Sequence, residues 1–231
     1  MPPLPRPRAF AFDLDGTLID SRRDIAAACN HVLLHAGRSP LPEAEIATYV
    51  GDGAMALLAR AFRIPTDAPE LRALHDEFVR YYGEHPVART DWMPGALEAL
   101  DALAGHPMAV VTNKTRTVTL TILEALGAAD RFAFTYGAGD GPLKPSPQPI
   151  HAVARALGVR AAELWVVGDG PQDVGAGRAA GSPTVGVLGG FQSEERLRLA
   201  APDRLIGSLS DLVALVAESY GASRPDRGSK I

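Results

Sequence analysis

Cysteine is almost absent from this chain, since Cys29 is the single one among 231 residues. One cysteine cannot form an internal disulfide, and we therefore expect a protein of the reducing cytoplasm. Lysine is also scarce: the 23 basic residues include only Lys114, Lys144 and Lys230. Because arginine is the ordinary cation here, each lysine indicates a position where a compact ammonium is favoured over a planar guanidinium.

Long apolar runs and excess positive charge are missing as well. No apolar run approaches the ~20 residues that span a bilayer, and the net charge of -4 offers no basic field for nucleic acid or an anionic membrane. The basic start "MPPLPRPR" is followed only by "AFAF" before Asp13, which does not predict a signal peptide. The final "SKI" differs from the peroxisomal signal Ser-Lys-Leu in its last residue, so we expect residues 221–231 to be a disordered tail.

What the chain does contain is a regular alternation of strand-like and helical segments. Helical patterns separate most of the apolar segments, and alternation of this kind predicts a parallel sheet with helices on both faces. We therefore expect an α/β fold with a Rossmann-like core. The expected strands are residues 9–15, 108–113, 131–137, 163–169, 183–188 and 203–208.

Residues 20–88 interrupt this alternation because their patterns are helical only. The expected helices are 23–37, 42–51, 53–62 and 68–85. We interpret 1–19 and 89–220 as an α/β core, and 20–88 as an inserted helical cap. Ligands of open α/β sheets bind beyond the carboxyl ends of the strands, so the cap would cover that site as a lid.

Polar residues end most of the predicted strands. Asp13 and Asp15 close the first one and point to the same face, because strand side chains alternate. Two close carboxylates disfavour each other's ionisation, so a cation, a shared proton or water must offset their repulsion. Further polar residues end or follow the later strands: Thr112, Asn113, Lys144, Asp169 and Asp173.

These residue types suit phosphate chemistry. Asp13 and Asp169, together with a backbone carbonyl, offer the hard oxygens that Mg²⁺ prefers. Lys144, Thr112 and Asn113 offer donors for a phosphoryl group. One aspartate of the first pair can attack phosphorus while the other exchanges a proton with the leaving group and with water.

The same motifs resemble, in order, those of the haloacid dehalogenase-like phosphohydrolases. They are "DLDGTLIDS" at 13–21, "VVTN" at 110–113, Lys144 within "LKPSPQP", and "GDGPQD" at 168–173, and the resemblance runs from about Ala9 to Ser219. It implies that Asp13 is the nucleophile and Asp15 the general acid/base. It further implies a Mg²⁺ site and a phosphate site with these members: Asp13, the backbone carbonyl of Asp15 and Asp169 for the metal, Thr112 and Lys144 for phosphate, and Asp173 as an acidic neighbour of the metal and the lysine.

Within this family the chain is similar to the phosphoglycolate phosphatase-like group, through "TLIDSRRDI", "YVGDGA", "MPGALEAL" and "AVVTNKT". Asp15 separates it from the dehalogenases, which lack that acid, and the helical insertion resembles the family's first cap type. The motif "GDGPQD" departs from the family, where Ser or Thr commonly replaces Gly170 and Asn replaces Gln172. This departure removes a hydroxyl beside the metal site.

The resemblance implies a Mg²⁺-dependent phosphatase of small phosphate monoesters, with an aspartyl-phosphate intermediate and 2-phosphoglycolate as the leading substrate. A sugar-phosphate phosphatase, a β-phosphoglucomutase-like mutase and a pyrophosphatase stay open as alternatives. A binding protein without catalysis is disfavoured. Such a protein would be expected to have lost catalytic residues, and all four of them are present: Asp13, Asp15, Lys144 and Asp169. Specificity should come from the cap, where Gly51, Asp52 and Gly53 are expected to face the site. The oligomeric state is not predicted.

Other features have ordinary structural explanations. His31 and His35 lie one helical turn apart, but no acidic third ligand falls at metal-site spacing, so we expect a partly exposed helix face. Cys29 is expected to be a small buried residue. The glycines of "GAGRAA" (175–180) and "GDGAMA" (51–56) predict close packing or hinges rather than a dinucleotide site. Four arginines could contact a substrate carboxylate but are expected to be surface charge: Arg22, Arg23, Arg60 and Arg63.

Overall fold

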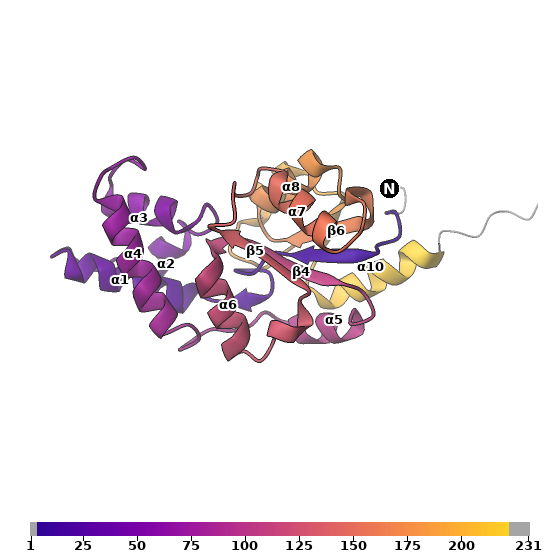
Figure 1. The fold of residues 1–231 in the computed structure, drawn as a ribbon, viewed down its shortest axis with the longest axis horizontal. Coiled ribbons are helices and arrows are strands. Elements are labelled where there is room, and N and C mark those ends of the chain that lie inside the picture. Colours follow the sequence, from indigo (N-terminus) through magenta and orange to yellow (C-terminus); the bar gives the residue numbers. More distant parts are fainter. Residues whose placement is uncertain (1–3, 222–231) are drawn as a thin grey trace, which may run out of the picture.

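The computed structural model describes residues 4–221, which form an α/β fold around a parallel sheet (Figure 1). The sheet has six strands in the order β5-β4-β1-β6-β7-β8, and every neighbouring pair is parallel. The predicted fold class is therefore confirmed. The strands are β1 (Ala9–Phe12), β4 (Met108–Thr115), β5 (Phe134–Ala138), β6 (Leu164–Gly168), β7 (Thr184–Val187) and β8 (Arg204–Ile206).

Helices cover both faces of the sheet because alternate residues of β1 point to opposite sides. Phe10 and Phe12 belong to an apolar cluster with α5, α6 and α10. Ala9 and Ala11 belong to a second cluster with α7 and α8. The helices are α5 (Ala96–Ala102), α6 (Arg116–Ala125), α7 (Gln148–Ala156), α8 (Pro171–Ala180), α9 (Glu194–Ala200) and α10 (Ser210–Gly221).

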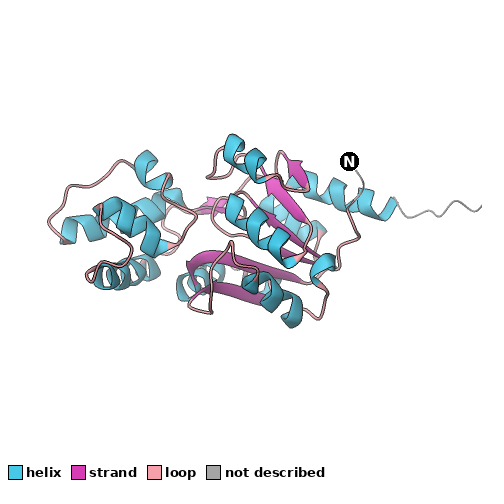
Figure 2. Ribbon diagram, turned by 90° about the horizontal axis from the view of Figure 1, so that it is seen from above, coloured by secondary structure: helices cyan, strands magenta, loops and turns pink. Residues whose placement is uncertain are grey.

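Four further helices form a lobe beside the sheet, at the left of Figures 1 and 2. α1 packs on α4, and α3 also packs on α4. Their apolar faces meet in a core that includes Leu33, Leu58 and Phe62. The helices are α1 (Arg22–His35), α2 (Glu43–Ala47), α3 (Ala54–Phe62) and α4 (Leu71–Glu84).

A two-stranded ladder stands between the sheet and this lobe. β2 (Ile19–Asp20) pairs antiparallel with β3 (Asp91–Trp92), and Asp20 lies opposite Asp91. The chain thus leaves for the lobe and returns from it at one place. The sequence does not predict this ladder, because two residues are too few to show an alternating pattern.

Several predicted elements are shorter in the structure, and one helix was not predicted. The strand expected at 9–15 ends at Phe12, so Asp13 and Asp15 follow it. The strand expected at 131–137 begins only at Phe134, because a 3-10 turn (η1, Ala129–Arg131) occupies its start. The helix expected at 42–51 ends at Ala47 and continues as turns. Helix α9 was not predicted, although the Ser193 side chain caps it by accepting from the N–H of Arg196.

Two expectations about small residues agree with the packing. Cys29 is fully buried. A Cβ at Gly177, in α8, would lie 2.5 Å from Cγ2 of Thr184, so α8 packs on the sheet more closely than any side chain would allow. No helix within residues 4–221 is both long enough and apolar enough to cross a membrane. Apart from Gly221, the predicted tail lies outside the described residues.

Candidate active site

The carboxyl edge of the sheet brings the predicted site residues to one pocket. Asp13 follows β1, Thr112 and Asn113 lie in β4, Lys144 lies between β5 and α7, and Asp169 follows β6. Asp173 lies in the first turn of α8. Because parallel strands end at the same edge, residues far apart in sequence converge there. The pocket is lined by Asp13, Asp15, Thr112, Asn113, Lys144, Asp169 and Asp173 together with residues of the helical lobe.

Lys144 is the central cation of this pocket. Its Nζ lies 2.8 Å from Oδ1 of Asp13 and 2.6 Å from Oδ1 of Asp173, and it donates to the carbonyl oxygen of Val111 at 2.6 Å. The side chain is 3% exposed. Burial alone lowers the pKa of a lysine, but attraction to Asp13 and Asp173 outweighs it and raises the pKa. The ammonium is therefore permanently charged.

Asp13, Asp169 and Asp173 form a compact acidic cluster, with carboxylate oxygens within 4.8 Å of one another. Burial and the charge of Asp173 raise the pKa of Asp13, and Lys144 only partly offsets this. Burial, and then the charge of Asp173, raise the pKa of Asp169 to about 6. The charge of Lys144 is therefore too small to balance the whole cluster, which favours a further positive charge. The hard oxygens of the cluster fit Mg²⁺, which would supply that charge.

The carboxylate of Asp169 is held in place by the backbone around it. Its Oδ2 accepts from the N–H of Phe191 at 2.6 Å, and its Oδ1 accepts from the hydroxyl of Thr17 at 3.3 Å. Gly16 makes this approach possible, because its φ is +87° and a Cβ there would lie 2.6 Å from Oδ2 of Asp169. The "DG" pair at 15–16 thus allows the first and last motifs to touch.

Asp15 does not contact the acidic cluster but a second lysine. Nζ of Lys114 donates to both its carboxylate oxygens at 2.8 Å each, and the hydroxyl of Ser21 donates to Oδ1 at 2.5 Å. The Lys114 side chain is 7% exposed, and its ammonium lies 4.5 Å from the ring centroid of Tyr82. Burial lowers the pKa of Lys114, but attraction to Asp15 outweighs it and the pKa is raised.

The side chain of Asn113, which was predicted to donate to phosphate, holds backbone groups instead. Its amide nitrogen donates to the carbonyls of Gly51 at 2.9 Å and Lys144 at 3.0 Å. Its amide oxygen accepts from the N–H of Lys144 at 2.9 Å. Both amide hydrogens are used, so the side chain fixes the Lys144 loop and has no donor left for phosphate.

The predicted cap segment reaches the core through three side chains. Gln172 donates to Oδ1 of Asp52 at 2.7 Å, Gln192 donates to the carbonyl of Val50 at 2.9 Å, and Asn113 holds Gly51 as described. Gly51 and Gly53 line the pocket, whereas Asp52 does not and also forms an ion pair with Arg60. Asp52 therefore bridges cap and core at the rim.

The wall that the helical lobe contributes is apolar. Ile25 of α1, Leu57 of α3, and Phe78 and Tyr82 of α4 line the pocket, with Val118 of α6. Burial raises the pKa of Tyr82 to about 12, so its hydroxyl stays protonated. Within the described part of the chain no group meets hydrogen-bond geometry with that hydroxyl, and Lys114 and Ser21 are the polar side chains near it. The four arginines considered from the sequence are absent from the pocket lining; Arg22, for example, pairs with Asp20.

Lys114 and Tyr82 were not assigned a role from the sequence. Lysine scarcity was a usable signal for Lys114, which directly follows the Thr112–Asn113 motif. No comparable signal marks Tyr82, whose spacing is that of an ordinary core residue on an amphipathic helix.

The chain is similar to known proteins both in sequence and in fold. Residues 10–187 match the family model described as haloacid dehalogenase-like hydrolase. The chain belongs to this family. Among the curated members of the family, phosphoglycolate phosphatase of Pectobacterium atrosepticum is 35% identical over 92% of this chain and 93% of its own. Phosphoglycolate phosphatase of Neisseria meningitidis is 37% identical, with 89% and 92% of the two chains covered.

A solved structure supports the fold. The crystal structure of a predicted phosphoglycolate phosphatase from Haemophilus somnus superposes with a TM-score of 0.81 at 28% identity. The match covers 90% of this chain and 97% of that one. The family resemblance stated from the four motifs is therefore confirmed.

Proposed function

We propose that this protein is a Mg²⁺-dependent phosphatase that hydrolyses small phosphate monoesters, with 2-phosphoglycolate as its leading substrate. The observation that carries the proposal is the pairing of Asp13 with Lys144 at 2.8 Å beside Asp15 in one pocket. The relatives named phosphoglycolate phosphatase support the choice of substrate. The expected binding partner is a small phosphorylated metabolite. Location in the reducing cytoplasm stays a prediction that rests on the single cysteine.

Asp13 is the proposed nucleophile. Its Oδ1 accepts from the N–H of Leu14 at 2.7 Å and lies 2.8 Å from Nζ of Lys144. Both contacts fall on Oδ1, so we assign the attack on phosphorus to Oδ2. Lys144 and the hydroxyl of Thr112 would hold the phosphoryl oxygens. Mg²⁺ would be held by Asp13, Asp169 and the backbone carbonyl of Asp15. When bound, it would stabilise the negative charge of the phosphoryl oxygens.

Asp15 is the proposed general acid and base. It would protonate the oxygen of the leaving alcohol and later take a proton from the water that hydrolyses the aspartyl-phosphate. In this structure Lys114 and Ser21 hold its carboxylate. Asp15 must therefore exchange partners to reach the leaving oxygen.

The pocket supports a leaving alcohol that carries a carboxylate. Lys114 and Lys144 are the cations among its lining residues. With Lys144 committed to the phosphoryl group, Lys114 is left for a second negative charge, and the Tyr82 hydroxyl adds a donor beside it. We assign both to the carboxylate of 2-phosphoglycolate. The same substrate would release Asp15 for proton transfer by taking its ammonium partner.

A sugar phosphate fits this pocket less well. A hydroxyl that met Ile25, Leu57, Phe78 or Val118 would find no hydrogen bond there, although Gln172 and Gln192 also line the pocket. Burying unpaired hydroxyls against such a wall costs about 1–3 kcal/mol each. No observation favours the mutase or the pyrophosphatase in the same way.

The deciding experiment is phosphate release with Mg²⁺ on matched esters. 2-Phosphoglycolate would be compared with 2-hydroxyethyl phosphate, which replaces the carboxylate with a neutral alcohol, and with glucose 6-phosphate and pyrophosphate. We expect kcat/KM for 2-phosphoglycolate to exceed that for 2-hydroxyethyl phosphate by about 10- to 150-fold, which corresponds to the roughly 1.5–3 kcal/mol of a charged hydrogen bond. Equal values would overturn the substrate assignment and leave the phosphatase mechanism standing. Isomerisation of a hexose phosphate without phosphate release would instead identify a mutase.

A further inference from the structure

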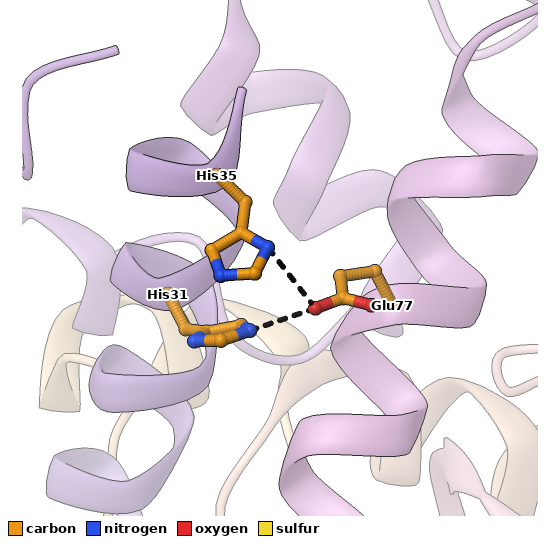
Figure 3. Close-up of side chains that lie close together, drawn as sticks. All are labelled: His31, His35 and Glu77. Carbon is orange, nitrogen blue, oxygen red and sulfur yellow. Dashed lines mark hydrogen bonds and ion pairs between the residues drawn. The ribbon is translucent and has the colours of Figure 1, made fainter. Parts of the chain in front are cut away.

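A second cluster of possible metal ligands lies in the helical lobe, away from the pocket. The sequence offers His31 and His35 without an acidic partner at suitable spacing. The structure corrects this, because α4 places Glu77 against both histidines of α1 (Figure 3). A sequence separation of 46 residues hides the partner from any local pattern.

The three side chains converge on one oxygen. Nε2 of His31 lies 2.7 Å from Oε1 of Glu77, and Nδ1 of His35 lies 3.6 Å from the same oxygen. Ligand atoms in a tetrahedral zinc site are about 3.3 Å apart, given metal–ligand bonds of ~2.0–2.1 Å. The two distances bracket that spacing, so small side-chain rotations would make room for an ion.

The histidine rings are already oriented. The ring of His31 lies against His35, with centroids 4.2 Å apart, and against Tyr81, with centroids 4.0 Å apart. Stacking on Tyr81 and the tilted contact with His35 limit the rotamers of His31 before any ligand arrives. Preorganised ligands lose less conformational entropy on binding.

The carboxylate of Glu77 is also fixed from its far side. Nε of Arg80 donates to Oε2 at 3.1 Å, and its NH2 group donates to Oε1 at 2.6 Å. The bond to Oε2 can persist while Oε1 turns to an ion, as hydrogen-bonded carboxylates do in metal sites. The competing arrangement is the present one, in which His31 and Arg80 share the carboxylate.

The exposure of the cluster suits ion entry. The His35 side chain is 63% exposed, whereas those of His31 and Glu77 are 21% and 26% exposed. One side of the cluster is thus open to solvent, and water can complete the coordination. Two imidazoles and one carboxylate favour Zn²⁺ and similar transition metals over Mg²⁺.

We propose that His31, His35 and Glu77 form a binding site for a divalent transition metal, Zn²⁺ in particular, which links α1 to α4. Both helices also line the pocket, through Ile25 on α1 and through Phe78 and Tyr82 on α4. A bound ion would therefore stiffen the wall of the lobe that faces the substrate.

The test is calorimetric titration of the untagged protein with ZnCl₂ in excess Mg²⁺, which occupies the catalytic carboxylates. The variants are His35→Gln and Glu77→Gln, with His85→Gln as the matched control. His85 also stacks on Tyr81, with centroids 4.5 Å apart, but does not belong to the cluster. We expect one Zn²⁺ per chain in the wild type and in His85→Gln. Each cluster variant should bind Zn²⁺ at least about tenfold more weakly. Loss of a residue that only hydrogen-bonds to a metal ligand already costs about tenfold in affinity, and loss of the ligand itself should cost no less.

A second readout locates the ion directly. Co²⁺ should give a visible absorption band in the wild type and in His85→Gln, and this band should be lost in His35→Gln. Thermal unfolding without metal shows whether each variant is folded. Absence of Zn²⁺ binding in the wild type, or equal binding in all folded variants, would overturn the proposal.

Discussion

Lys114 donates to both carboxylate oxygens of Asp15 at 2.8 Å each, and so holds the proposed acid/base in an ion pair. The two contacts keep the carboxylate turned toward the lysine. The pair therefore describes a resting arrangement. Proton donation to a leaving alcohol requires that another anion take the place of Asp15.

Lys114→Met tests that exchange. Loss of the ammonium should reduce kcat/KM for 2-phosphoglycolate by about 30- to 1,000-fold, which corresponds to roughly 2–4 kcal/mol for a buried charged contact. The loss for 2-hydroxyethyl phosphate should be at least tenfold smaller, because that ester presents no carboxylate. Both esters are measured under the same Mg²⁺ concentration. Equal losses on the two esters would mean that Lys114 serves Asp15 alone.

Asp13→Asn should abolish turnover and leave the fold intact. The amide cannot attack phosphorus, and we expect kcat to fall by at least about 10³-fold, as when a catalytic nucleophile is removed. Removing one charge from the acidic cluster also relieves repulsion, so the thermal midpoint without metal should stay level or rise. Phosphate release and a thermal melt check the two parts. Substantial turnover by the folded variant would exclude the aspartyl-phosphate route.

The acidic cluster predicts an unusual pH dependence of stability without metal. Burial and Asp173 raise the pKa of Asp169 from 3.8 to about 6. A carboxyl that binds its proton more tightly in the folded state is destabilising once ionised. Its contribution should fall as the pH rises from about 4 to about 6, by on the order of 3 kcal/mol, and then level off.

Urea unfolding in EDTA at pH 4, 5, 6 and 7.5 measures this effect, with Asp169→Asn as the control that should lack the Asp169 part of it and keep the part due to Asp13, whose pKa is also raised. Mg²⁺ should restore stability at pH 7.5, since an ion that binds only the folded state stabilises by about 2.7 kcal/mol at a hundred times its Kd. A wild-type profile identical to that of Asp169→Asn, with no response to Mg²⁺, would contradict the assigned metal site.

Cys29 should be inert in the native protein. Burial raises the pKa of its thiol to about 12, so almost no thiolate exists near neutral pH. Reaction with a thiol reagent at pH 8 should be at least about 100-fold slower than in guanidinium chloride. Absorbance of the released chromophore gives both rates. Rapid labelling of the native protein would show that α1 opens readily, because Cys29 lies on that helix.

Much of the fold followed from periodicity. The pattern of β1 predicted a strand buried on both sides, and Phe10 and Ala11 indeed face different apolar clusters. Elements with little pattern escaped prediction. The two-residue strands β2 and β3 are one example, and α9, whose start depends on the cap at Ser193, is another.

The site divides in a similar way. Convergence of Asp13, Lys144 and Asp169 could be predicted because parallel strands share an edge. The contact between Gln172 and Asp52 could not, since it joins residues 120 positions apart through side-chain rotamers. The same holds for Asn113, whose amide is used for loop contacts rather than for phosphate. Local patterns specify where the backbone goes, whereas partners of individual polar atoms depend on the assembled structure.

The pairing of Asp20 with Asp91 has an evolutionary consequence. Since the chain departs and returns at adjacent positions, the whole segment between them can be exchanged for another of different length without displacing β1 or β4. Recombination with one crossover at each end would replace this segment and leave Asp13, Lys144 and Asp169 in the chain. Chimeras joined at these two aspartates would thus offer a direct route to altered specificity in the laboratory, as duplication and shuffling offer one in nature.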